Sequence, residues 1–78
     1  MKSTRKFVDG DTIYWESSSG EFHREDGPAI ECEDGDRYWY IDGKRLAYMD
    51  DGVVVIEEDF GELPPLIKQS IVMEKLKA

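Results

Sequence analysis

Five aspartate–glycine pairs divide most of this chain into short segments, and they constrain its fold more than any other feature. The pairs are Asp9-Gly10, Asp26-Gly27, Asp34-Gly35, Asp42-Gly43 and Asp51-Gly52. Asp-Gly supplies the two positive-φ residues that a type I′ hairpin turn requires, and glycine does so without steric cost. The segments between the pairs are rich in Tyr, Trp, Ile and Val, which favour strands. The pattern therefore predicts an antiparallel array of β-hairpins.

The elements expected from this pattern form one domain over residues 1–78, of mainly β (α+β) class. The hairpin repeat sheet occupies 9–60, and a C-terminal helix follows the two prolines over 64–77. The fold is an antiparallel β-hairpin meander of about six short strands with one C-terminal helix. The strands are placed at 12–16, 21–24, 29–33, 37–41, 44–48 and 53–57.

The apolar residues of the expected helix lie on two sides rather than in one stripe. One side can cover the sheet. The other side needs a second cover, which is either the N-terminal segment or another molecule.

Two-residue turns fix the strand register, and the register assigns each side chain to a face. The turn at Asp42-Gly43 sets Trp39 opposite Leu46, and the turn at Asp34-Gly35 sets Ile30 opposite Trp39. The turn at Asp51-Gly52 sets Tyr48 opposite Val55. One face, the expected core, then carries Ile30, Cys32, Trp39, Ile41, Leu46, Tyr48, Val53 and Val55.

The other face mixes tyrosines, acids and a few aliphatic residues, a composition that suits recognition and also suits simple solvation. The candidate partner-binding residues on it are Glu31, Glu33, Asp36, Tyr38, Tyr40, Arg45 and Met49. Strand rise places Glu31 and Glu33 about 6.6 Å apart, a spacing able to meet a basic groove.

Charge is unevenly distributed along the chain. Residues 9–62 carry seventeen acids and four basic residues, a net charge of −13, whereas the ends carry +5. Direct nucleic-acid binding is not expected of such an acidic body, and a protein with a basic surface is the more natural partner. A blander interpretation is that the acids keep a small sheet soluble and its edges unpaired.

No cofactor, metal site or catalytic residue is expected, so the chain is not predicted to be an enzyme. His23, the only histidine, is expected to be buried and hydrogen-bonded to a turn backbone. Cys32, the only cysteine, is expected to be an inert thiol on the core face, and a lone thiol fits a reducing cytoplasm. No stretch is long and apolar enough to span a membrane, and no signal peptide is indicated.

The segment 20–29, GEFHREDGPA, is the most specific string in the chain. It resembles phage and bacterial MORN-variant-like repeat proteins with the hairpin motif W-Y-x-x-G-x-x-H-R-x-D-G-P-A. Tyr38-Trp39 begins what looks like a second copy, offset by 24 residues, in which Leu46-Ala47 replaces His-Arg. The resemblance implies a hairpin scaffold over roughly 9–60 with a capping helix, and it associates the chain with antitoxins, immunity proteins and phage inhibitors of host defence.

The expected function is therefore a small acidic protein-binding inhibitor, phage or mobile-element encoded and acting in the host cell cytoplasm. It would block a host defence or nucleic-acid-handling protein in an anti-CRISPR-like way, with DNA mimicry as one version. The first alternative is an antitoxin or immunity protein that neutralises a partner toxin. The second alternative is a structural module that self-associates, for example as a homodimer.

Overall fold

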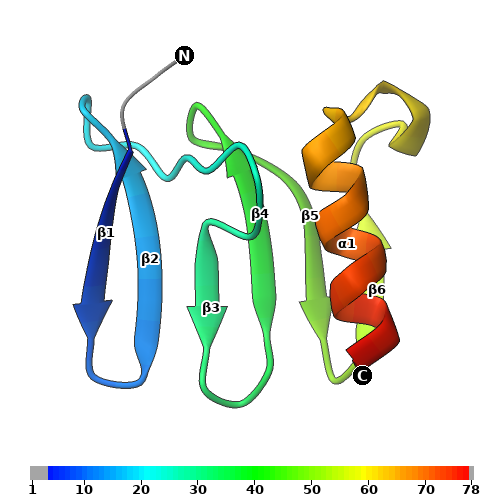
Figure 1. Cartoon of the computed structure of the whole chain (residues 1–78), viewed down its shortest axis with the longest axis horizontal. Helices are drawn as coiled ribbons and strands as arrows, with labels where there is room; N and C mark the ends of the chain where they lie inside the picture. Colours follow the sequence, from blue (N-terminus) through cyan, green and yellow to red (C-terminus); the bar gives the residue numbers. More distant parts are fainter. Residues whose placement is uncertain (1–3, 78) are drawn as a thin grey trace.

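The computed structural model describes residues 4–77, which form one six-stranded antiparallel sheet and one long helix. The strands follow one another across the sheet in chain order, from β1 to β6, as Figure 1 shows. They are β1 (Thr4–Asp9), β2 (Thr12–Ser17), β3 (Ile30–Cys32), β4 (Arg37–Ile41), β5 (Lys44–Asp50) and β6 (Val53–Ile56). A 3₁₀ turn, η1 (Phe60–Glu62), and the helix α1 (Pro65–Lys77) complete the chain. The expected meander with one C-terminal helix is confirmed.

The helix lies on one face of the sheet, over its β5 and β6 end (Figure 1), and the core forms beneath it. Trp39 and Ala47 from neighbouring strands are fully buried there, and the indole Nε1 of Trp39 donates a hydrogen bond to Ser70 Oγ on α1 at 3.0 Å. The core residues are Trp39, Leu46, Ala47, Met49, Leu63, Ile67 and Ile71. We call this side of the sheet the helix face and the other side the open face.

The hairpins at Asp42-Gly43 and Asp51-Gly52 have the expected turns, with positive φ at both central residues. Tyr48 lies opposite Val55 as predicted. The predicted pairing of Trp39 with Leu46 is wrong, because a β-bulge between Trp39 and Tyr40 shifts the register so that Trp39 faces Ala47. A bulge adds one residue to one strand, which moves every following side chain to the opposite face.

The β3–β4 connection departs from expectation in the same way. Cys32 N donates a hydrogen bond to Asp36 O at 3.0 Å, which closes a turn of three residues, 33–35, in place of the two residues Asp34-Gly35, so Ile30 lies opposite Tyr38 and not opposite Trp39. As a result Ile30 and Cys32 do not belong to the core face, and the bulge between Trp39 and Tyr40 removes Tyr48, Val53 and Val55 from it.

The first strand was missed by the sequence patterns, and one expected strand does not form. β1 precedes the first turn and pairs along its whole length with β2. Residues 21–24 form only an isolated bridge, between Glu16 and Phe22, and lie between β2 and β4 in line with β3. Their backbone bonds to both of these strands, because His23 N donates to Trp15 O at 3.1 Å and Arg24 N donates to Tyr40 O at 3.2 Å. Residues 25–28 loop out between 21–24 and β3, so 21–24 and 29–33 occupy one strand position in the sheet and not two.

Candidate functional site

The open face carries a row of large side chains that crosses the whole sheet. Antiparallel partners directly opposite each other project to the same face. The register places in this row, one from each strand, Phe7, Tyr14, Ile30, Tyr38, Tyr48 and Val55. Phe22 and Tyr40 extend it toward one end, and we call these eight residues the aromatic row. All of them are at least partly exposed, since no element of residues 4–77 covers this face.

Ring contacts hold the aromatic row together. Phe7 stacks on Tyr14 with centroids 5.2 Å apart, and Tyr14 meets Phe22 edge-on at 5.9 Å. Phe22 then contacts Tyr40 at 5.3 Å, while Tyr38 stacks on Tyr48 at 6.3 Å. Such pairs restrict the rings before any partner arrives, which lowers the entropy that binding must overcome. The row is therefore a preorganised, half-exposed aromatic surface.

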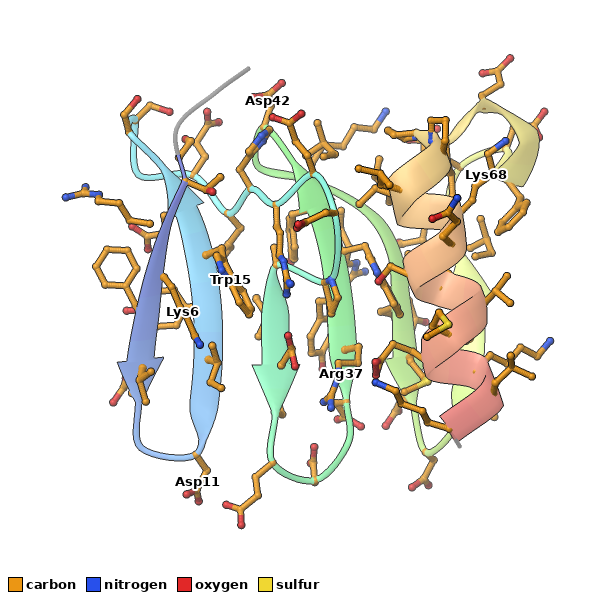
Figure 2. All side chains as sticks on the ribbon, viewed as in Figure 1. Lys6, Asp11, Trp15, Arg37, Asp42 and Lys68 are labelled. Atoms are coloured by element: carbon orange, nitrogen blue, oxygen red, sulfur yellow. The ribbon has the colours of Figure 1, made fainter. Side chains whose placement is uncertain are left out.

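Three acidic turns border this surface at one end of the sheet, where β1–β2, β3–β4 and β5–β6 connect (Figure 1). Figure 2 labels Asp11 at the first of them. No Lys or Arg lies within the turn segments 9–11, 33–36 and 50–52. Their seven acids are Asp9, Asp11, Glu33, Asp34, Asp36, Asp50 and Asp51.

Desolvation, followed by the crowding of these acids, raises pKa values in and beside the turns. Partial desolvation raises the pKa of Asp36, and the charges of Asp34 and Asp50 raise it further. Desolvation and Asp36 likewise raise the pKa of the Tyr38 phenol, so it stays a neutral hydrogen-bonding group. Cationic groups of a partner would relieve this repulsion, so the edge favours a basic protein surface.

Five of the seven predicted partner-binding residues lie on or beside the open face. Tyr38 and Tyr40 belong to the aromatic row, and Asp36 and Glu33 lie in the β3–β4 turn that borders it. The Arg45 guanidinium lies 4.8 Å from the Tyr48 ring centroid and forms a two-pronged ion pair with Glu57, whose pKa it lowers. These residues are brought together as expected.

The other two lie on the helix face. Met49 is only 6 % exposed beneath the helix, because the register shift turns it to the helix face. Glu31 also faces the helix side, where its carboxylate pairs with Arg24 at 2.9 Å and Arg37 at 3.8 Å. Glu33, in the β3–β4 turn, does not share a strand face with Glu31. The expected Glu31/Glu33 pair on one strand face is therefore not presented.

The prediction for His23 is confirmed, whereas the predicted position of Cys32 is wrong. His23 is buried as predicted, and its Nδ1 accepts a hydrogen bond from the backbone N of Asp42, 2.9 Å away in the β4–β5 turn. Cys32 is half-buried on the open-face side rather than in the core. Desolvation, with Asp34 and Asp36, raises the pKa of its thiol, which keeps it protonated and a poor nucleophile.

The looped-out segment after His23 covers the helix face where the helix does not reach. The Arg24 guanidinium stacks 3.9 Å from the Trp15 ring centroid and donates to Pro28 O at 3.1 Å. Figure 2 shows Lys6 beside Trp15, with its Nζ 5.8 Å from the ring centroid. A Cβ on Gly27 would come within 2.8 Å of Arg24 Cζ, so any other residue there would displace this guanidinium. The contacts of the H-R-x-D-G-P-A string are thus internal to the fold.

Six of the eight residues of the aromatic row were not among the predicted binding residues. Phe7 lies on the missed strand, although a hairpin turn at Gly10 requires a strand before it. Tyr14 occupies the same place in the sequence repeat as Tyr38, a signal that could have identified it. Tyr48 is displaced by the bulge, for which the sequence carries no recognisable signal.

Other kinds of site have no support in the described part of the chain. Residues 4–77 contain no group of His, Cys, Asp and Glu side chains arranged to hold a metal ion. The same residues contain no helix long and apolar enough to cross a membrane. No protein-family model, no curated protein and no solved structure matches this chain.

Proposed function

We propose that this protein binds another protein through its open face and inhibits it by covering the surface that it binds. The observation that carries the proposal is the aromatic row, which is preorganised by ring contacts and left uncovered by α1. Tyrosine combines a large contact area with a hydrogen-bonding group and little conformational entropy to lose, which makes it a frequent energetic centre of interfaces.

The acidic turns beside the row define the chemistry of the partner. A negatively charged border accelerates encounter with a basic surface and disfavours acidic competitors. Basic grooves are typical of proteins that handle nucleic acid. The finer proposal is therefore an inhibitor of a host defence or nucleic-acid-handling protein that competes with nucleic acid for such a groove, in the host cytoplasm.

Affinity capture from host lysate, followed by competition, tests this proposal. The tagged protein is used as bait, and each retained protein is then titrated in purified form. We expect binding to weaken steeply with salt and to compete with double-stranded DNA. Binding that neither salt nor DNA affects would contradict the nucleic-acid-handling version. If a retained protein is a toxin encoded beside this gene, the antitoxin function replaces the proposal of an inhibitor of a nucleic-acid-handling protein.

A further inference from the structure

The helix α1 has two apolar sides, of which only one packs against the rest of residues 4–77. Ile67 and Ile71 are buried against the sheet at 0 % and 3 % exposure. On the outer side Leu66 is 53 % exposed, Val72 48 %, Met73 58 % and Leu76 78 %. Large apolar side chains exposed together on one helix side mark an interaction surface.

The spacing of these residues indicates what kind of surface would cover them. Leu66, Met73 and Leu76, with the exposed Gln69 between them, follow the alternating three- and four-residue steps of a coiled-coil seam. Val72 lies along one flank of this seam. We call these five residues the helix stripe. A seam this narrow fits one further helix better than a sheet or a broad groove.

The charges at the two ends of α1 indicate which helix would cover the stripe and in which orientation. The carboxyl end of α1 carries Lys75 and Lys77, whereas acids, among them Glu58 and Glu62, precede its amino end. An antiparallel pair of these helices places each basic end beside the acidic end of the other and aligns the helix dipoles favourably. A parallel pair would bring like charges together.

We propose that the helix stripe is covered by the helix stripe of a second copy of this chain, in an antiparallel two-fold dimer. In the register that sets Leu66 opposite Leu76 and Gln69 opposite Met73, Lys77 lies beside Pro65 of the second copy. Glu62 of that copy precedes Pro65 by three residues, in η1, and so belongs to the acidic end that Lys77 approaches. The interface is self-complementary and closed, so association stops at two chains.

This dimer goes beyond the proposed function, because it uses the side of the molecule opposite the open face. The two helices lie between the two sheets, and both aromatic rows face outward. Each dimer would present two identical binding surfaces, which strengthens binding to a partner that is itself dimeric or repeated. One helix side per chain is a small interface, so we expect a dissociation constant on the order of 10⁻⁵ to 10⁻⁴ M.

Sedimentation equilibrium of the full chain over a wide concentration range tests the proposal. We expect a monomer–dimer equilibrium without larger species. The double variant Met73→Glu, Leu76→Glu should weaken it by about tenfold or more, since it buries charge in the seam. Val53→Glu is the matched control, because Val53 is 62 % exposed on the open face, away from the helix stripe, and should leave the equilibrium unchanged. Circular dichroism verifies that each variant is folded.

A charge exchange tests the antiparallel register. Lys77→Glu and Glu62→Lys should each weaken the dimer by about threefold to tenfold, because two-fold symmetry uses the pair twice. The variant carrying both changes should regain wild-type affinity. A chain that stays monomeric at all concentrations, or a dimer indifferent to the stripe variant, overturns the proposal. A double variant as weak as the single ones overturns the antiparallel arrangement.

Discussion

The helix face and the open face are built from the same six strands, yet they differ in what covers them. On the helix face, α1 buries Trp39 and Ala47 completely. On the open face, the corresponding neighbours Tyr38 and Tyr48 stack on each other and remain partly exposed. Stability is thus concentrated on one side of a slab only 16 Å thick, and the other side keeps a large aromatic surface available. In so small a domain, one face can supply the core while the other recognises a partner.

The largest expected effect is on the helix face. Trp39→Ala removes a fully buried ring and its hydrogen bond to Ser70. The expected loss of about 3–5 kcal/mol in the free energy of unfolding is most of what a small domain possesses. Trp15→Ala, at the equivalent place in the repeat, should cost only about 1–2 kcal/mol because that ring is partly exposed. Urea unfolding followed by circular dichroism measures both, and equal losses would contradict the contrast.

A smaller effect is expected where the looped-out segment replaces the helix as cover. Arg24→Ala removes the stacking on Trp15, the hydrogen bond to Pro28 O and the ion pair with Glu31. We expect a loss of about 1–3 kcal/mol in the same unfolding measurement. Arg24→Lys should recover only part, because lysine lacks the forked donors. Lys6→Ala is the control, because the Lys6 ammonium lies farther from the Trp15 ring than the Arg24 guanidinium does. An equal loss of unfolding free energy for Lys6→Ala would contradict a specific role of the Arg24 contacts.

The open face should show the reverse balance between stability and binding. Tyr38→Ala removes a half-exposed ring stacked on Tyr48, and we expect it to cost about 1 kcal/mol of unfolding free energy or less. The same change should weaken partner binding by about tenfold or more, since it removes a central tyrosine of the aromatic row. Calorimetric titration against the captured partner measures this effect. A large stability loss with unchanged binding would make the row structural.

The smallest expected effect concerns the ionisation of Asp36. Because its pKa is raised in the folded chain, its carboxyl group favours folding below its unfolded pKa and opposes folding once it is ionised in the fold. Asp36→Asn should therefore raise the melting temperature near pH 7, and this gain should disappear as the pH falls below about 4. Glu57→Gln should do the opposite near pH 7, since Arg45 lowers the pKa of Glu57. Melting curves near pH 7 and below about pH 4 test both predictions. A gain for Asp36→Asn that does not depend on pH would contradict the raised pKa of Asp36.

Sequence patterns predicted the hairpin topology, the helix and the buried histidine, because each depends on local chemistry. Asp-Gly pairs force turns, and the two prolines end the strand region. The faces were only half predictable, because face assignment depends on an exact residue count. One bulge beside Tyr40 was enough to move Met49 into the core and Tyr48 out of it, and one additional residue in the β3–β4 turn moved Ile30 and Cys32 out of it as well. Neither irregularity has a recognisable signal in the sequence.

The most direct test of the account compares the two faces in one capture experiment. Tyr38→Ser with Tyr48→Ser alters the open face, and Val8→Ser alters an exposed apolar residue of the helix face as a matched control. Both variants and the wild type, shown by melting to be folded, serve as baits in host lysate, and quantitative mass spectrometry compares the proteins retained. The account predicts that partners of the wild type are kept by Val8→Ser and lost by the tyrosine variant. Equal retention by the tyrosine variant would contradict the open face as the binding surface.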